Sequence, residues 1–268
     1  MIRQVPPLFI LLGVLGFLLL YIPVVVMMVY SFNAGKLSSV WAGFSVKWYG
    51  ALLSNDALLA ALGKSLLIGA VAASLSTIFG LLIAACFVRF GRFRGRLLLS
   101  ALASAPLVIP EVVMGLSLLL LFIAMEQLLG WPQGRGLDTI IIAHATFGMC
   151  FAAVVIQARL RQFDTALEEA AMDLGARQPF IFFTITLPLI APAIVSAWLL
   201  TFTLSFDDLV IASFVSGPGS STLPIVIFSK VRLGVTPEIN AIATLMIVII
   251  ATGVIAGTAL MARRQKSS

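Results

Sequence analysis

Six apolar stretches, each long enough to cross a lipid bilayer as a helix, dominate this chain of 268 residues. The hydrocarbon core of a bilayer is about 30 Å thick, which about 20 residues of α-helix can span. Only 10% of the residues are charged, whereas soluble domains carry about 25%. The sequence therefore predicts a single all-α membrane domain over residues 1–268. Its spans are expected at Leu8–Phe32, Ser65–Val88, Leu97–Met125, Thr139–Ala158, Leu187–Leu204 and Ala241–Met261.

The first stretch has the position of a signal peptide but not its pattern. Its apolar run exceeds the roughly 7–15 residues of a signal sequence, and no small-x-small cleavage site follows it. We expect it to be retained as a membrane span.

Positive charge is distributed unevenly between the two sides that alternating spans define. Eleven Lys and Arg residues lie on one side and six on the other. Lys and Arg are enriched in cytoplasmic loops, so the pattern predicts that both termini are cytoplasmic. The segment between the fourth and fifth spans is then cytoplasmic as well. The net charge of +6 reflects these loops, and we expect no nucleic-acid partner.

An acidic segment follows the fourth span and has the pattern of a short amphipathic helix. Thr165 and Glu168 have the spacing of a capping box, with Thr165 as the N-cap. Gly175 is a natural helix stop, and Pro179 is well placed to begin a second helix. An apolar stripe with spacing i, i+3, i+4, i+7 is formed by Leu167, Ala170, Ala171 and Leu174. The segment is expected to dock a partner or to be solvated without one.

The same segment carries a long, gapless motif: Glu-Ala-Ala, three residues, Gly, nine residues, Ile-x-Leu-Pro. This motif resembles the signature loop of permease subunits of bacterial ATP-binding-cassette importers. The resemblance implies a type I importer fold with six transmembrane helices, and it makes the loop at about 163–186 the coupling helix. The implied coupling residues are Glu169, Ala170, Ala171, Asp173, Gly175, Ile185, Leu187 and Pro188.

The resemblance also implies that the chain is a permease without catalytic activity of its own. A phosphate-binding loop of the form G-x-x-x-x-G-K-[ST] is absent, because Leu58 stands where Gly63-Lys64-Ser65 would need a first Gly. ATP and Mg²⁺ are therefore expected on a partner ATPase, and this chain is expected to bind no cofactor. Its Cys and His residues show no metal-ligand spacing.

Several other segments resemble the polyamine branch of this family, which imports putrescine and spermidine. The implied partners are a homologous second permease, an ATPase dimer and a periplasmic polyamine-binding protein, in the bacterial inner membrane. The segments that carry this resemblance are Ser31-Phe32-Asn33, Lys47-Trp48-Tyr49, Phe202–Asp208, Ser216-Gly217-Pro218 and Gly234–Ala241.

Polyamines carry several ammonium groups, so a path for them needs carboxylates and aromatic faces. Glu111 lies inside the third expected span, after Pro110, where an acidic group is costly and therefore a functional candidate. Asp207 and Asp208 follow the fifth span, and in the resembling family this position lines the path. Phe202 and Phe206 offer aromatic faces, although such residues also pack against lipid or core. The sequence leaves open whether Glu111 and the membrane residue His144 serve transport or packing.

Three rival functions remain open at this point. An ion-coupled secondary transporter tends to show inverted repeats, which we do not find. An intramembrane enzyme lacks support because neither H-E-x-x-H nor G-x-S-x-G occurs. A permease of the same fold for another solute is the nearest alternative.

Overall fold

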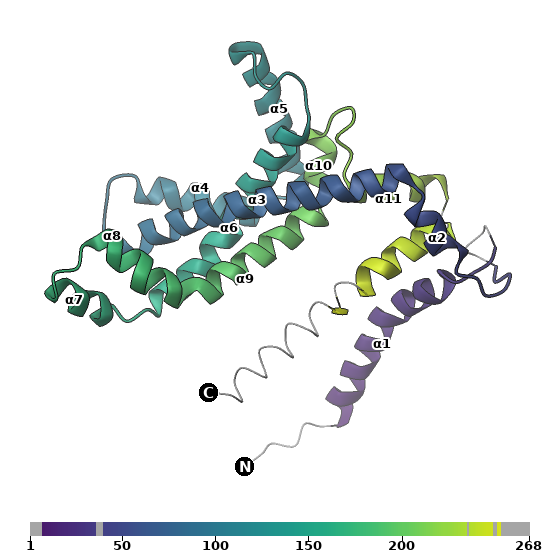
Figure 1. Cartoon of the computed structure of the whole chain (residues 1–268), viewed down its shortest axis with the longest axis horizontal. Coiled ribbons are helices and arrows are strands. Elements are labelled where there is room, and N and C mark those ends of the chain that lie inside the picture. The colour runs from purple at the N-terminus through teal and green to yellow at the C-terminus, as the bar shows by residue number, and fades with distance from the viewer. Residues whose placement is uncertain (1–6, 36–39, 235, 249–250, 253–268) are drawn as a thin grey trace. The chain divides into compact units, whose positions relative to one another are not determined.

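The computed structural model describes residues 7–35, 40–234, 236–248 and 251–252, and regular structure there is helical apart from one β-bridge between Asn33 and Phe44. The helices follow one another along the chain as coloured in Figure 1. They are α1 (Pro7–Tyr30), α2 (Lys47–Leu53), α3 (Asp56–Arg89), α4 (Arg96–Val108), α5 (Glu111–Leu129), α6 (Leu137–Arg161), α7 (Ala166–Asp173), α8 (Gln178–Ile181), a π-helical turn (Phe182–Thr186), α9 (Leu187–Phe206), α10 (Val210–Val215) and α11 (Leu223–Leu233).

Five helical stretches in the described part of the chain are long and apolar enough to cross a membrane. They are Leu8–Tyr30, Asp56–Arg89, Glu111–Leu129, Leu137–Arg161 and Gln178–Phe206. About half of the sixth expected span, Ala241–Met261, lies outside the described residues, and its beginning belongs to the helical segment Pro237–Val248. The membrane-spanning type of the protein is thus confirmed, and the count of six spans stays a prediction.

The third expected span, Leu97–Met125, is not one continuous helix, and this prediction is wrong. α4 ends at Val108, and Ile109 and Pro110 follow with ψ angles of 132° and 138° before α5 begins at Glu111. Proline lacks an N–H and disfavours a helical conformation in the residue before it. The break therefore has a local cause, and it places Glu111 in the first turn of α5.

The chain divides into two units, residues 1–59 with 227–268 and residues 60–226. In the first unit, the Asn33 side chain organises the loop after α1. Its Nδ2 donates to the Val40 carbonyl at 2.7 Å, and its Oδ1 accepts the Ala42 N–H at 2.8 Å.

Also in this unit, Glu238 accepts hydrogen bonds from Asn55 at 2.9 Å and Lys230 at 3.1 Å. The expected single domain over residues 1–268 stays a prediction.

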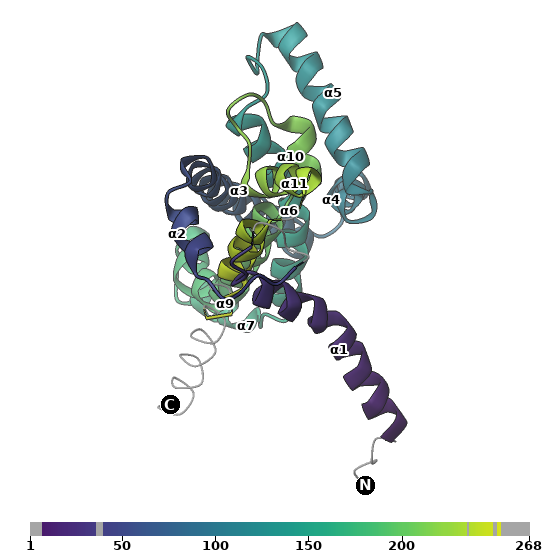
Figure 2. The ribbon, with the colours of Figure 1, turned by 90° about the vertical axis from the view of Figure 1, so that its right-hand side faces the viewer.

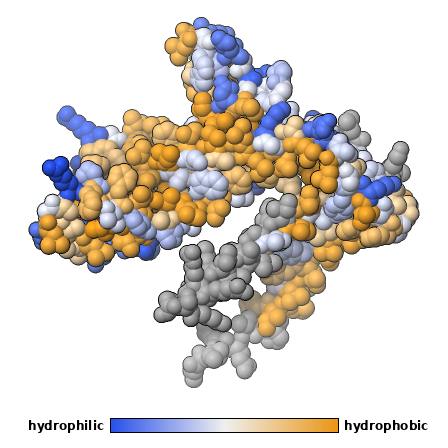
Figure 3. Space-filling view, in the orientation of Figure 1, coloured by the Kyte–Doolittle hydropathy of each residue, from blue (hydrophilic) through white to orange (hydrophobic). Residues whose placement is uncertain are grey.

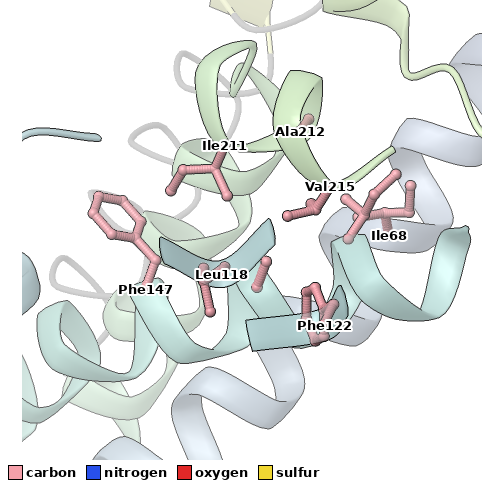
Figure 4. Close-up of a cluster of buried hydrophobic side chains, with 9 residues drawn as sticks. Ile68, Leu118, Phe122, Phe147, Ile211, Ala212 and Val215 are labelled. Carbon is pink, nitrogen blue, oxygen red and sulfur yellow. The ribbon is translucent and has the colours of Figure 1, made fainter. Parts of the chain in front are cut away.

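The second unit is built around α6, which lies near its middle in the end-on view of Figure 2. One face of α6 packs with α5 and α10, where side chains from separate helices converge in Figure 4. The buried members of this cluster are Ile68, Leu118, Phe122, Ile140, Ala143, Phe147, Ile211, Ala212 and Val215. A second cluster joins α6 to α3 and α9, through Ala84, Ala152, Ile156, Leu160, Ile190 and Ala197.

The contact of α3 with α6 depends on two glycines. A Cβ on Gly80 would lie 2.6 Å from the Ala152 Cβ and 2.8 Å from the Ala153 backbone nitrogen. A Cβ on Gly148 would lie 2.5 Å from the Ser76 Oγ. Small residues allow membrane helices to approach closely, because packing rather than hydrophobicity drives their association.

The outer surface of the second unit is largely apolar. Figure 3 shows hydrophobic residues over much of this unit, with hydrophilic residues gathered near the end that carries α7 and at the tip of α5. Many large side chains are exposed there, among them Leu97 and Leu128. This distribution fits helices that face lipid or another membrane subunit along their length.

Candidate functional site

α7 is the short helix that the acidic segment was predicted to form, but it begins differently. The Asp164 carboxylate accepts the Ala166 N–H at 3.0 Å, whereas the Thr165 hydroxyl caps nothing in α7. Thr165 already has helical backbone angles, φ −67° and ψ −18°, while a capping side chain normally requires an extended N-cap. The predicted capping box is therefore wrong, and the Glu168 side chain is released for another contact.

The end of α7 follows the prediction for Gly175. This residue has φ +84°, the left-handed conformation that only glycine adopts without strain. The Gly175 N–H donates to the Met172 carbonyl at 2.8 Å, and the Ala176 N–H donates to the Ala171 carbonyl at 3.0 Å. These two bonds form a Schellman motif, which closes the helix and turns the chain toward α8.

The apolar stripe of α7 is open to the surroundings. No residue of α7 is buried, and the Leu167 and Leu174 side chains are 49% and 90% exposed. Ala170, Glu169 and Asp173 are exposed on the same short helix. An apolar face in this position, flanked by acidic side chains, has the properties of a docking surface.

Between α8 and α9 the helix widens into a π-turn, which sequence reasoning missed. The Leu187 N–H reaches back five residues to the Phe182 carbonyl. Pro188 is the sequence feature that could have predicted this turn. It has no N–H to donate to the Thr184 carbonyl, so the regular α-helical hydrogen bond at this position is missing. Ile185 and Leu187 are half-buried around this turn, Pro188 is exposed, and Thr186 is only 1% exposed.

Glu168 joins three elements. Its two carboxylate oxygens accept hydrogen bonds from both terminal nitrogens of Arg89, the last residue of α3, and one oxygen also accepts the Thr186 hydroxyl. The Arg89 guanidinium lies over the Phe163 ring, 5.6 Å from its centre. Burial alone raises the pKa of Glu168, but hydrogen bonds from Arg89 and Thr186 and the Arg89 charge hold it below its usual value.

This lowered pKa predicts how stability varies with pH. A carboxylate whose folded pKa lies below its unfolded value of about 4.3 stabilises the fold above that value, and the contribution is lost as pH falls through the folded pKa. We expect wild type to unfold at a higher temperature than Glu168→Gln between pH 7 and 5. The difference should shrink below about pH 4. A constant difference across this range, measured on the purified protein in nanodiscs, would contradict the assignment.

A polar cluster lies between α6, α9 and α10. His144 Nδ1 hydrogen-bonds to Ser205 Oγ at 2.6 Å, and His144 Nε2 lies 3.2 Å from Asp208 Oδ2. The Asp208 carboxylate also accepts the Ala212 N–H at 2.7 Å and the Ile211 N–H at 3.3 Å. Asp208 thus caps α10 and contacts His144, so both side chains have packing partners in this structure.

Aromatic rings form a stack along α9. The Trp198, Phe202 and Phe206 rings are spaced at 5.3 and 5.7 Å, within 14° of parallel. The stack packs against α3. The Phe202 ring contacts Gly69, and Trp198 Nε1 donates to Ser74 Oγ at 3.1 Å. Asp207 follows directly and is exposed. Sequence reasoning named both Phe residues and missed Trp198, although the spacing of four residues was visible.

Glu111 is exposed at the start of α5, after the Pro110 break. About one helical turn later, Gly115 packs against α10, and a Cβ there would lie 3.3 Å from Ile211 Cα and 2.6 Å from the Phe214 ring. Asp207 lies in the short segment between α9 and α10, outside both helices. In the described residues, no group of three or more His, Cys, Asp or Glu has the arrangement of a metal site.

Long apolar helices around α6, with an exposed two-helix loop at one end, define an integral membrane protein with several spans. Comparison with known families makes the assignment specific. The chain belongs to the family described as "Binding-protein-dependent transport system inner membrane component", whose model matches residues 76–267. It is therefore a multi-span protein of the inner membrane.

Curated relatives cover most of the chain. The putrescine transport system permease protein PotI of Escherichia coli K12 is 56% identical over 254 residues, which are 94% of this chain and 90% of PotI. The spermidine/putrescine transport system permease protein PotC is 41% identical in E. coli K12, over 88% of this chain and 87% of PotC. PotC of Haemophilus influenzae is 44% identical, over 86% and 87%.

Solved structures support the fold. A chain of a bacterial ABC transporter for the import of alginate superposes with a TM-score of 0.68 at 19% identity, covering 92% of this chain and 93% of that chain. The MetNI methionine ABC transporter gives a TM-score of 0.60 at 17% identity, covering 77% and 94%. At these identities the likeness concerns the fold alone, which is that of ABC importer membrane domains.

Proposed function

We propose that this chain is a permease subunit of an ATP-driven, binding-protein-dependent importer of polyamines, putrescine or spermidine. Its substrate class is supported by 56% identity to PotI and 41% to PotC, each over most of both chains. Its mode of action is supported by α7, the exposed helix at one end of the second unit (Figure 1). ATP hydrolysis is assigned to a separate ATPase subunit, because no phosphate-binding loop of the form G-x-x-x-x-G-K-[ST] occurs in this sequence.

The proposed complex contains this chain, a homologous second permease, an ATPase dimer and a periplasmic polyamine-binding protein. α7 docks on the ATPase, and closure of the ATPase dimer on ATP moves the loop and, with it, the membrane helices. The exposed apolar face of α7 and the apolar outer surface of the helices support two separate contacts, one with the ATPase and one with the second permease.

The proposed topology has six spans and cytoplasmic termini. It rests on the count of Lys and Arg and on five spans that the described residues supply. Membrane-impermeant thiol labelling of single cysteines tests it, with positions in the α6–α9 loop and at both termini expected to react only from the cytoplasmic side. Labelling of either terminus from the periplasmic side would contradict this topology.

ATP hydrolysis by the assembled complex in lipid nanodiscs tests the function. Binding protein loaded with putrescine or spermidine should stimulate hydrolysis, and binding protein for an unrelated amino acid should not. Stimulation by a different solute would keep the permease class and discard the polyamine assignment. Transport by this chain alone under an ion gradient would favour the secondary transporter instead.

We further propose that Asp207 and Glu111, with the aromatic faces of Phe202 and Phe206, line the path of the cation. Asp207 supports this because it is exposed beside the aromatic stack, whereas the Asp208 carboxylate already caps α10. If Asp208 also binds the cation, it does so by exchanging these partners.

Removing the Asp207 charge should lower polyamine uptake. Hydrogen bonds to charged groups contribute about 1.5–3 kcal/mol, so Asp207→Asn is expected to reduce uptake by about tenfold or more. Asp207→Glu keeps the charge and should retain most of the uptake. Asp208→Ala removes the α10 cap and should instead lower the yield of assembled complex. Normal uptake by Asp207→Asn in proteoliposomes would remove Asp207 from the path.

A further inference from the structure

Glu168 and Glu169 are neighbours in α7 with opposite surroundings. Glu169 is exposed, while the Glu168 side chain is 14% exposed and holds Arg89 and Thr186. A carboxylate that receives both nitrogens of one guanidinium is held in a defined orientation, which a single hydrogen bond does not achieve. The Phe163 ring beneath the guanidinium restricts Arg89 further.

The remaining connections of α7 to the second unit are weak. None of its residues is buried, and Gly175 follows at its end in a conformation that a two-bond turn maintains. Along the chain, residues 174–177 between α7 and α8 are not helical, so the helical backbone is interrupted there. A force applied to α7 therefore has no continuous helical route along the backbone to α9, and none to the end of α3.

The Glu168 side chain supplies both routes. Arg89 is the last residue of α3, and Thr186 is the last residue of the π-turn that leads into α9. We propose that Arg89, Glu168 and Thr186 form a clamp that makes the ends of α3 and α9 move together with α7 when a partner displaces this helix. Glu168 is then a positioning residue for coupling, and Glu169 faces the partner. This inference rests on the proposed function.

The coupling ratio of the assembled transporter tests the clamp. Polyamine taken up per ATP hydrolysed is measured in proteoliposomes, together with complex yield. Allosteric couplings are typically 5–150-fold, so Arg89→Gln and Glu168→Gln should lower this ratio by about fivefold or more while the complex still assembles. Arg92→Gln removes the same charge from the neighbouring exposed turn and should leave the ratio unchanged.

Two further comparisons separate the clamp from general stability. Thr186→Val removes the hydroxyl but keeps the shape of the side chain, and it should lower the coupling ratio. Thr186→Ser keeps the hydroxyl and should retain the wild-type ratio. Arg89→Glu combined with Glu168→Arg should recover part of the ratio that either single change loses. Wild-type ratios in Glu168→Gln, or equal ratios for the two Thr186 variants, would overturn the proposal.

A second measurement does not depend on the identity of the substrate. Spin labels at Leu174→Cys and Arg92→Cys, with Cys86 and Cys150 replaced by Ala, report the distance between α7 and the end of α3 in the complex. With the clamp intact, the mean distance should be the same without nucleotide and in the ATP-trapped state. Glu168→Gln should broaden the distribution of distances. A distance that changes between the states, or a width that Glu168→Gln leaves unaltered, contradicts the clamp. If polyamines fail to stimulate the wild-type complex, only the proposed function fails.

Discussion

Gly80→Leu is expected to prevent the permease from accumulating in the membrane. The glycine lies where α3 crosses α6, and even a Cβ there would lie 2.6 Å from the Ala152 Cβ and 2.8 Å from the Ala153 backbone nitrogen. Backbone atoms cannot turn aside as a flexible side chain does, so the helices must separate. Overpacking typically costs about 1–3 kcal/mol, so Gly80→Ala should already lower the unfolding temperature measurably.

Gly63 provides the matched control, because it lies in the same helix and a Cβ added to it would meet no atom within 4 Å. Gly63→Ala should leave the yield unchanged or raise it, since Ala favours helix by about 1 kcal/mol over Gly. Size-exclusion chromatography of the detergent-extracted protein and thermal unfolding measure both effects. Equal yields of Gly80→Leu and wild type would show that α3 and α6 do not cross at Gly80.

Gly175→Val is expected to uncouple ATP hydrolysis from transport. Gly175 has φ +84° and closes α7 in a Schellman motif, and a left-handed conformation costs an ordinary residue about 1–2 kcal/mol. A β-branched side chain tolerates the left-handed conformation even less. The end of α7 should therefore unwind, and the orientation of α8 relative to α7 should change. Each 1.4 kcal/mol corresponds to a factor of about ten, so uptake per ATP should fall by about tenfold or more.

Gly175→Asn separates backbone conformation from side-chain size. Asn adopts the left-handed region more readily than other residues, so this variant should retain much of the coupling. Complex yield and the affinity of the binding protein for polyamine serve as controls, and neither should change in Gly175→Val. Normal coupling in Gly175→Val would mean that the helix stop has no part in transmission.

Local patterns in the sequence predicted the helices of this protein well. The apolar stretches correspond to α1, α3, α6 and α9, because a span of this length has no other way to satisfy its backbone in lipid. The helix stop at Gly175 was also predicted correctly, and α8 begins one residue before the predicted Pro179, since each boundary depends on one residue with a special backbone preference.

The errors arose where neighbours along the chain gave competing signals. Apolar composition suggested one span over Leu97–Met125, but Pro110 divides it, because a missing N–H outweighs favourable hydropathy. The spacing of Thr165 and Glu168 suggested a capping box, but Asp164 holds the first turn, and Glu168 instead pairs with a residue that lies 79 positions away. No local pattern contains that partner.

By itself, the sequence determined that this protein is helical, crosses a membrane and carries a polar loop with a family motif. These properties follow from hydropathy, from the spacing of apolar residues and from single Gly and Pro positions, all of which act within one or two helical turns. Only the tertiary structure decided which acidic side chains are engaged. Asp208 caps α10 beside His144, Glu168 joins α3 to the π-turn, and Asp207 stays exposed. Those differences depend on which helices pack together, because the environment of a carboxylate is set by groups brought near it in space.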